Sequence, residues 1–335
     1  MKQPLVSILI PFKDTQEFLD ACLKSIIAQT YKNWQLIAVN DHSSDNSNLI
    51  VLKYCEKDSR IQVHTNEGQG IIAALRHAYL KSNGQLITRM DADDIMSPNK
   101  LEIMSKSLFE KGRGHVALGQ VKYFAENGIK NGYKRYEQWL NKLTLTGSNY
   151  LEIYKECVIP SPCWMTFRED LDVCGAFDSD RYPEDYDLAF RFYEKGLQCI
   201  PSYDILHFWR DYLSRTSRTS PNYSQNYFLD IKLHYFFKLD RNPQRPLVVW
   251  GAGNKGKTIV KSLIAEQINF YWVCDNSNKI GKEIYGKQML HFSFIAQLKH
   301  PQSIITVANK EAQQTINDFL QKLKHENMKD YFFFC

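Results

Sequence analysis

The chain of 335 residues is 44% hydrophobic and 24% charged, an ordinary globular composition with enough length for two hydrophobic cores. Its net charge is +5, but Lys and Arg are interspersed with acids instead of forming blocks, which argues against a nucleic-acid partner. No stretch approaches the roughly 20 consecutive apolar residues that span a bilayer, and the eight cysteines include no CxxC pair. We therefore expect a cytoplasmic protein that contacts a membrane at most peripherally, at its inner face.

The first 90 residues alternate between apolar runs of strand length and segments in which apolar residues recur at helical spacing. The predicted strands are 5–10, 34–40, 61–64 and 85–90, and the predicted helices lie in 14–29, 49–55 and 71–82. Continuous hydrophobicity suits strands that are covered on both faces. This rhythm predicts an α/β protein with a doubly wound sheet and a ligand crevice at the carboxyl ends of its strands.

The pattern beyond residue 98 is more varied. Its predicted elements are a helix over 101–108, a strand over 116–123, an aromatic-rich and less regular region over 133–154, a helix opened by acids at 184–187, and a strand over 203–209. Residues 240–246 are typical of a linker. We therefore predict two domains, residues 1–240 and 241–335.

Glycines at a strand-to-helix turn mark the second predicted domain. A strand over 247–250 is followed by Gly251, Gly253 and Gly256, and Asp275 ends the next predicted strand. In Rossmann-like dinucleotide-binding units such glycines let a pyrophosphate approach the backbone, and such an acid binds a ribose hydroxyl. These four residues are thus candidates for a site that takes a dinucleotide or another nucleotide. The alternative is that the glycines only permit a tight turn.

Three carboxylates, those of Asp91, Asp93 and Asp94, come directly after the fourth predicted strand. Acids at the carboxyl edge of an α/β sheet can hold a hard divalent cation that bridges to phosphate oxygens. The alternative is a capping turn, since short Asp-x-Asp strings are common. The position after a buried strand favours a site for a metal and a nucleotide.

Several segments together resemble family 2 glycosyltransferases in both order and spacing. They are residues 6–12, 39–45, 70–75, 89–94, 175–178 and 184–187. The resemblance covers about the first 220 residues. It implies a GT-A fold, with a mixed and mostly parallel sheet, that takes a nucleotide-activated sugar, usually with Mn²⁺ or Mg²⁺, and transfers the sugar with inversion at the anomeric carbon.

The resemblance also implies roles for residues at the first two strand ends. Pro11, Lys13 and Asp14 would line the nucleoside pocket, and Asp41 would hydrogen-bond the base, commonly uracil. The donor is therefore expected to be a UDP-sugar.

For the metal, the resemblance implies that Asp93 is the principal ligand and that Asp91 lies near both ribose and metal. Asp94 would be a helper that faces the donor sugar. His207 matches a position where some GT-A enzymes supply a third metal ligand, although a lone histidine is more often simply packed or hydrogen-bonded.

Inversion in a single displacement requires a general base on the acceptor side. By the resemblance Asp185 occupies that position, with Glu184 beside it. Without the resemblance, acids in a first helical turn would be explained by the helix dipole alone.

We expect an inverting, hexosyltransferase-type enzyme of glycan or polysaccharide biosynthesis, whose acceptor is a hydroxyl of a glycan, a lipid-linked sugar or another molecule. One alternative is a sugar nucleotidyltransferase, but residues 11–14 are not the Gly-rich, Arg- and Lys-containing loop that such an enzyme would carry after its first strand. Another is a non-catalytic regulator that binds nucleotide sugars, against which the intact Asp91, Asp93 and Asp185 argue.

Overall fold

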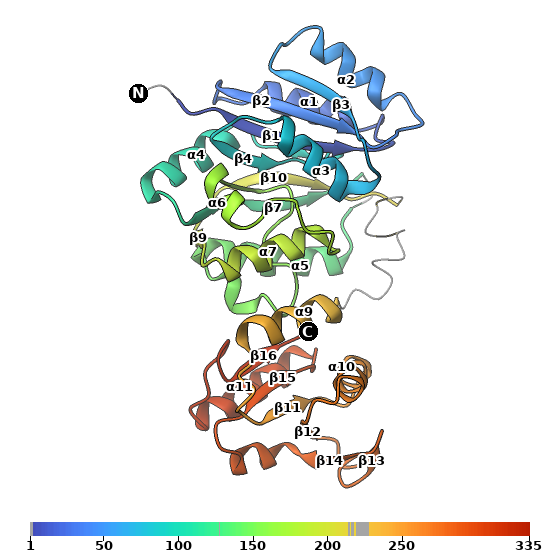
Figure 1. The fold of residues 1–335 in the computed structure, drawn as a ribbon, viewed down its shortest axis with the longest axis vertical. Coiled ribbons are helices and arrows are strands. Elements are labelled where there is room, and N and C mark those ends of the chain that lie inside the picture. The colour runs from blue at the N-terminus through green and yellow to red at the C-terminus, as the bar shows by residue number, and fades with distance from the viewer. Residues whose placement is uncertain (1–2, 127, 214, 216–217, 219–227) are drawn as a thin grey trace. The chain divides into compact units, whose positions relative to one another are not determined.

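The computed structural model describes residues 3–126, 128–213, 215, 218 and 228–335, and it divides the chain into two compact units (Figure 1). The first unit comprises Met1–Tyr150 and Cys157–Ser220, and the second comprises Leu151–Glu156 and Pro221–Cys335. The predicted domain boundary at residue 240 stays a prediction.

A seven-stranded sheet forms the centre of the first unit. In spatial order its strands are β3 (Ile61–Thr65), β2 (Trp34–Asn40), β1 (Val6–Phe12), β4 (Leu86–Arg89), β8 (Trp164–Phe167), β6 (His115–Leu118) and β9 (Gln198–Ile200). Only β8 runs antiparallel to its neighbours. Every residue of β1 and β2 is buried, which explains their unbroken hydrophobicity. The expected mixed, mostly parallel sheet is confirmed.

Helices connect these strands. They are α1 (Leu19–Ile27), α2 (Ser47–Cys55), α3 (Gly70–Lys81), α4 (Lys100–Lys111), α6 (Arg168–Val173) and α7 (Glu184–Glu194). In α1 the buried residues are Leu19, Cys22, Leu23 and Ile26, whose spacing places them on one face. Helix α7 begins at the second acidic cluster, as predicted.

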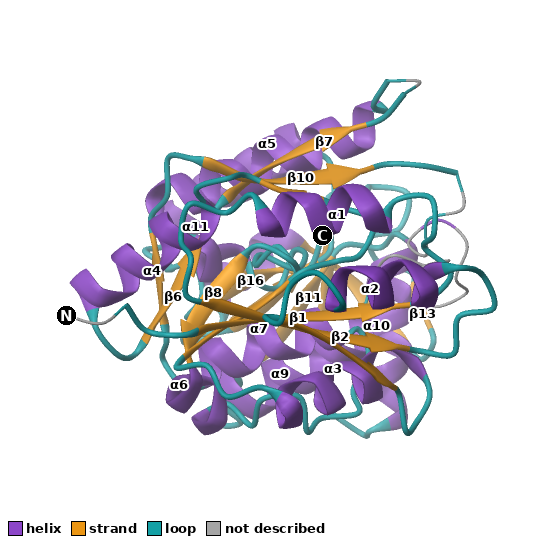
Figure 2. Cartoon of the chain, turned by 90° about the horizontal axis from the view of Figure 1, so that it is seen from above, coloured by secondary structure: helices purple, strands orange, loops and turns teal. Residues whose placement is uncertain are grey.

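A second, three-stranded sheet lies in the same unit. Its central strand β10 (Ile205–Arg210) pairs antiparallel with β5 (Ile95–Met96) and parallel with β7 (Gln120–Phe124), so it connects the segment after the first acidic cluster to the rest of the unit. Figure 2 shows β7 and β10 side by side, with α5 (Asn131–Thr146) near them.

The expectation that residues 133–154 are less regular was wrong over most of that range. Helix α5 covers residues 131–146, and a short 3-10 helix covers Asn149–Glu152. Leu140 and Leu143 are buried on α5. Its Asn141 and Glu137 side chains accept hydrogen bonds from the backbone N–H groups of Val121 (2.9 Å) and Tyr123 (2.6 Å), which satisfies donors of β7.

The predicted strand over 116–123 is two strands, β6 and β7, that belong to different sheets. The break is at Gly119, where a Cβ atom would lie 2.6 Å from Leu206 Cβ and 2.8 Å from Cys163 Sγ. Only glycine allows this close approach. The break between β6 and β7 therefore has a steric cause, which the alternation of apolar residues in the sequence does not reveal.

We predict that Gly119→Ala lowers the free energy of unfolding by about 1–3 kcal/mol, because the added methyl group overpacks a closed contact. The urea midpoint measures this loss. Gly132, in the first turn of α5, is the matched control, since a Cβ there meets no described atom within 4 Å. An alanine at Gly119 with a wild-type midpoint would show that the contact is not tight.

The second unit contains a six-stranded sheet and is Rossmann-like, as predicted. Its strands in order are β13 (Glu283–Ile284), β14 (Lys287–His291), β12 (Tyr271–Cys274), β11 (Leu247–Trp250), β15 (Gln302–Ile305) and β16 (Tyr331–Phe333). All pairings except β13 with β14 are parallel. The helices are α9 (Leu229–Tyr235), a π-helix over Phe236–Asp240, α10 (Asn254–Ala265), a 3-10 helix over Phe292–Gln297 and α11 (Lys310–Lys322).

Two expectations about the whole chain concern thiols and membrane spans. All eight cysteines lie in the described residues, and none forms a disulfide. Across the described ranges, no helix combines the length and the apolar character needed to cross a membrane.

Candidate active site

Three parallel strands of the first unit end at one edge of the main sheet. Strand β1 lies between β2 and β4, so Asp14 after β1, Asp41 after β2 and Asp91 after β4 come to the same edge. The order of the strands reverses between β1 and β4, which is where α/β sheets bind ligands. Pro11 is buried within β1, and Lys13 is exposed just beyond it.

Hydrogen bonds hold the predicted nucleoside-binding acids in place. The Asp41 side chain is buried, and its Oδ1 accepts from Asn66 Nδ2 (2.7 Å) and from the Gly70 N–H (3.0 Å) at the start of α3. Asp14 Oδ1 accepts from the Ser44 N–H (2.7 Å). The loop after β1 is thereby tied to the loop after β2.

A buried arginine, to which the sequence analysis gave no role, joins the two acidic clusters. Arg89 is the last residue of β4, and its Nε and Nη2 each lie 3.0 Å from Asp91 Oδ1. Its Nη1 lies 2.8 Å from Oε1 of Glu184, the first residue of α7. A buried cation needs carboxylate partners, so an Arg on a buried strand next to three acids was the signal that could have found it.

The middle acid of the first cluster, Asp93, is partly buried among like charges. Burial, Asp94 and Asp91 together raise the pKa of Asp93 to about 7. Its Oδ2 accepts a hydrogen bond from the Tyr212 hydroxyl (2.9 Å), a contact that the sequence analysis also missed. Carboxylates that repel one another in this way fit a divalent cation, which would relieve the repulsion.

The third acid, Asp94, is fully buried and is engaged by protein groups on both oxygens. Oδ2 lies 2.9 Å from His207 Nε2, and Oδ1 accepts from the Arg210 N–H (2.8 Å). Burial raises the pKa of Asp94 and lowers the pKa of His207, so both groups favour their uncharged forms. Among the described atoms His207 Nδ1 has no hydrogen-bond partner although it is buried.

Metal-ligating histidines commonly pair their other ring nitrogen with a carboxylate, as His207 does with Asp94. Within the ranges that the structure describes, however, no set of three or more His, Cys, Asp or Glu side chains is arranged to hold a metal. Mg²⁺ needs no such set, since one or two carboxylates and substrate phosphates commonly bind it. Asp91 and Asp93 therefore fit such an ion.

The second acidic cluster carries the predicted base. Burial and the neighbouring Glu184 raise the pKa of Asp185 to about 7, while the positive charge of Arg89 opposes this rise. A carboxylate with a pKa near neutral is suited to general base catalysis. Asp187, two residues on, instead accepts a hydrogen bond from Arg191 Nε (2.8 Å).

A family model described as glycosyl transferase family 2 matches residues 7–175, half of the chain. The match contains β1 from Ser7 onward, β2, β4 and the cluster at residues 91–94. The chain belongs to glycosyl transferase family 2. The family resemblance expected from the sequence is therefore confirmed.

Two curated proteins illustrate how this family 2 member relates to others. The UDP-Glc:alpha-D-GlcNAc-diphosphoundecaprenol beta-1,3-glucosyltransferase WfgD of Escherichia coli is 37% identical over 130 residues, which are 38% of this chain and 50% of that protein. Glycosyltransferase GlyG of Streptococcus pneumoniae serotype 4 is 31% identical over 125 residues, 37% of this chain and 42% of that protein. The chain thus spans half or less of these curated relatives.

Solved structures of other glycosyltransferases share the fold of this family 2 member. S. aureus TarS in complex with UDP-GlcNAc superposes with a TM-score of 0.51 at 16% identity, over 71% of this chain and 68% of that one. The mannosyltransferase PcManGT from Pyrobaculum calidifontis, in complex with GDP-Man and Mn²⁺, gives 0.54 at 18% identity, over 79% and 76% of the two chains. The GT-A-type fold expected from the sequence is confirmed.

The glycine-rich turn of the second unit lies outside the matched family region. A Cβ atom on Gly256 would lie 2.2 Å from the Gly251 carbonyl oxygen, and one on Gly251, where φ is +125°, would lie 2.4 Å from Thr306 Oγ1. Packing therefore requires these two glycines. A Cβ on Gly253 meets no described atom within 4 Å. Asp275 is exposed directly after β12, the strand beside β11.

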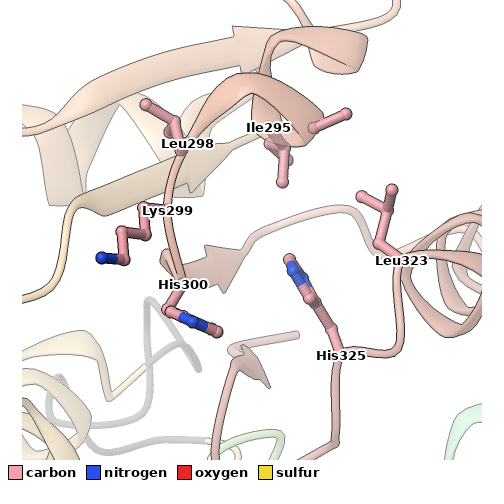
Figure 3. Close-up of a pocket in the computed structure, with 7 residues that line it drawn as sticks. Ile295, Leu298, Lys299, His300, Leu323 and His325 are labelled. Carbon is pink, nitrogen blue, oxygen red and sulfur yellow. The ribbon is translucent and has the colours of Figure 1, made fainter.

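A cavity of about 270 Å³ lies elsewhere in the second unit (Figure 3), and its lining consists of Ile295, Ala296, Leu298, Lys299, His300, Leu323 and His325. Its lining contains no predicted site residue. It has two histidines and a lysine beside apolar side chains, and no acid.

Proposed function

We propose that the chain transfers a sugar, with inversion, from a nucleotide diphosphate sugar to a hydroxyl group. The observation that carries this proposal is that two acidic clusters meet through Arg89 at the carboxyl edge of a family 2 domain. One cluster suits a cation and a diphosphate, and the other suits a general base. A nucleotidyltransferase would not need the second cluster.

For the donor, the proposal places a UDP-sugar at the ends of β1, β2 and β4, with Pro11, Lys13, Asp14 and Asp41 around the nucleoside. WfgD is named for a UDP-Glc donor, and TarS was crystallised with UDP-GlcNAc, which supports uracil as the base. The buried Asp41 carboxylate offers an acceptor for a base N–H, and its hydrogen bonds to Asn66 and Gly70 keep it in place.

For the cation, we assign Asp91 and Asp93 as the protein ligands, while the donor diphosphate supplies further oxygens; His207, expected from the resemblance as a third ligand, forms no three-residue metal-binding set with them among the described residues. When bound, Mn²⁺ or Mg²⁺ supplies a positive charge that stabilises the leaving diphosphate. The PcManGT complex with Mn²⁺ supports a divalent ion in this fold. We propose that Asp94 influences the donor sugar only indirectly, by fixing the positions of His207 and of the Arg210 backbone. Both of its carboxylate oxygens already make hydrogen bonds to these two residues.

On the acceptor side, Asp185 removes the proton from the acceptor hydroxyl. The oxygen then forms a bond to the anomeric carbon, while the bond from that carbon to the diphosphate breaks and its electron pair leaves with the diphosphate. Attack opposite the leaving group inverts the anomeric configuration. With a pKa of about 7, Asp185 is ionised in a large fraction of molecules at neutral pH.

For the acceptor, we propose a lipid-linked or glycan hydroxyl in polysaccharide biosynthesis. WfgD is named for a diphosphoundecaprenol-linked GlcNAc acceptor. The net charge of +5 is compatible with peripheral binding at an anionic membrane surface.

The test of the proposed function is release of the nucleotide diphosphate by the full chain. UDP-Glc, UDP-GlcNAc and GDP-Man are each supplied with Mn²⁺ and a GlcNAc-diphospholipid. We expect acceptor-dependent release from a UDP-sugar and a product of inverted configuration by NMR. Product of retained configuration would contradict the mechanism, and release without dependence on Mn²⁺ would contradict the assigned cation.

We also infer that the second unit binds a nucleotide through Gly251, Gly253, Gly256 and Asp275. The supporting observation is that the packing of the described atoms requires Gly251 and Gly256 but not Gly253. An open middle glycine is what close approach of a pyrophosphate needs. The alternative remains a structural turn.

We predict that Gly253→Val weakens nucleotide binding at least about tenfold while it changes the free energy of unfolding by at most about 1 kcal/mol. Calorimetric titration of the full chain with NAD⁺ and with UDP measures the binding. Because the first unit is also proposed to bind UDP, the titrations are made in proteins that also carry Asp93→Asn. This substitution removes a proposed cation ligand of the first site, so that the second site is observed by itself. A wild type that binds neither nucleotide in that background would leave the glycines with a structural role only.

A further inference from the structure

The Arg89 side chain spans the two halves of the proposed active site. On one side its Nε and Nη2 hold Asp91, on the donor side, and on the other its Nη1 holds Glu184, the neighbour of the proposed base. The side chains of Arg89, Asp91 and Glu184 are only 6%, 21% and 10% exposed. One positive charge is therefore held between two negative charges, largely out of water.

The chemistry of this contact requires an arginine. The planar guanidinium group presents donors in a fixed fork, so the positions of Asp91 and Glu184 are fixed relative to one plane. A lysine has a single nitrogen on a flexible stem and would not define that geometry. Buried ion pairs contribute little to stability, because the cost of desolvation offsets the attraction between the charges. Stability therefore does not explain why Arg89 is paired with Asp91 and Glu184.

Helix α7 is held at two separate points. Farther along the helix, Arg191 donates to Asp187 (2.8 Å) and to the Ala176 carbonyl (2.8 Å), which anchors the second turn to the preceding loop. At the start of the helix, the N-cap residue Pro183 makes no side-chain hydrogen bond, and Asp185 Oδ1 accepts from the Tyr186 N–H (2.8 Å). The contact from Arg89 to Glu184 links this first turn to β4.

We propose that Arg89 is a positioning residue, which fixes the first turn of α7 against the donor-binding acid so that Asp185 lies in line with the leaving group. This inference rests on the proposed function. Misplacement of a reacting group by about 1 Å can lower a rate about 100-fold. Arg89 therefore governs kcat through geometry, without contact with either substrate.

The test replaces Arg89 with methionine, which keeps the length of the side chain and removes its charge and donors. In the full chain, Arg89→Met is expected to lower kcat for transfer about 100-fold and to change the KM for the donor less than about threefold. Arg191→Met is the matched control, since it removes another largely buried arginine that holds the same helix, with a side chain 13% exposed. Its kcat is expected to fall less than about tenfold.

A double-mutant cycle then asks whether Arg89 acts through Glu184. If it does, Arg89→Met combined with Glu184→Gln is expected to have a kcat within about threefold of Arg89→Met alone. If kcat of the double variant instead falls by the product of the two single losses, the proposal is overturned. Equal losses of kcat in Arg89→Met and Arg191→Met would also overturn it.

Arg89→Lys covers the case in which Arg89→Met does not fold. It retains the charge and is expected to lower kcat about tenfold with donor KM maintained; an unchanged kcat would overturn the proposal. The wild type separates this inference from the proposed function. If wild-type protein transfers no sugar, the proposed function fails, whereas a fully active Arg89 variant beside an active wild type refutes only the role of Arg89.

Discussion

Asp185→Asn is expected to abolish sugar transfer while binding of the donor is maintained. The amide is isosteric with the carboxylate but cannot take the proton of the acceptor hydroxyl, and loss of a general base lowers a rate by a factor on the order of 10²–10⁴. Single-turnover transfer measures the chemical step, and the thermal shift with UDP-sugar and Mn²⁺ measures donor binding.

The same assignment predicts the pH dependence of the wild type. Since burial and Glu184 raise the pKa of Asp185 to about 7, kcat/KM should rise about tenfold per pH unit below that value and level off above it. Asp180→Asn is the control, because its side chain is 84% exposed and pairs with Arg76. An Asp185→Asn variant with wild-type turnover would remove Asp185 from this role.

Asp93→Asn is expected to have opposite effects on ligand binding and on stability. With a ligand carboxylate gone, Mn²⁺ should no longer increase the thermal stabilisation by a UDP-sugar. Without metal at pH 8, however, the variant should be more stable than the wild type by about 1–3 kcal/mol, because it no longer buries a charge and no longer holds one beside Asp94 and Asp91.

The sign of the pH dependence follows from the raised pKa. Between pH 4 and 7 the unfolded carboxylate of Asp93 is ionised, whereas the folded one, with a pKa of about 7 instead of 3.8, still binds a proton. The contribution of Asp93 to stability is therefore present at low pH and lost as the pH rises through 7. Urea unfolding of wild type and Asp93→Asn at pH 5 and 8 measures this, with Asp180→Asn as control. Equal urea midpoints of the wild type and Asp93→Asn at pH 8 would contradict the destabilising effect of the buried Asp93 charge.

The sequence was sufficient to predict the sheet edge where the acids meet. Buried parallel strands are continuously apolar, so β1, β2 and β4 are recognisable locally, and the residues that follow them must share an edge. Helix α7 was predicted for a similar reason, because its acids and its inward-facing residues lie within one short segment.

Contacts between distant segments could not be predicted in this way. Arg89 and Glu184 are 95 residues apart, and their contact depends on where the start of α7 lies relative to the end of β4. Likewise, the break at Gly119 depends on Leu206 in β10 and on Cys163, the residue before β8. The burial of Asp94 against His207 has the same origin, because it requires β5 and β10 to pair.

The central claim is that the first unit binds a nucleotide sugar through a cation held at the Asp93 cluster. The most direct test is the melting temperature of the full chain with UDP-sugars, GDP-Man and no ligand, each with and without Mn²⁺. A UDP-sugar at about 100 times its Kd stabilises by about 2.7 kcal/mol, which should raise the transition by about 5 °C or more only when Mn²⁺ is present. No shift with any nucleotide sugar, or an equal shift without Mn²⁺ and in Asp93→Asn, would contradict the account.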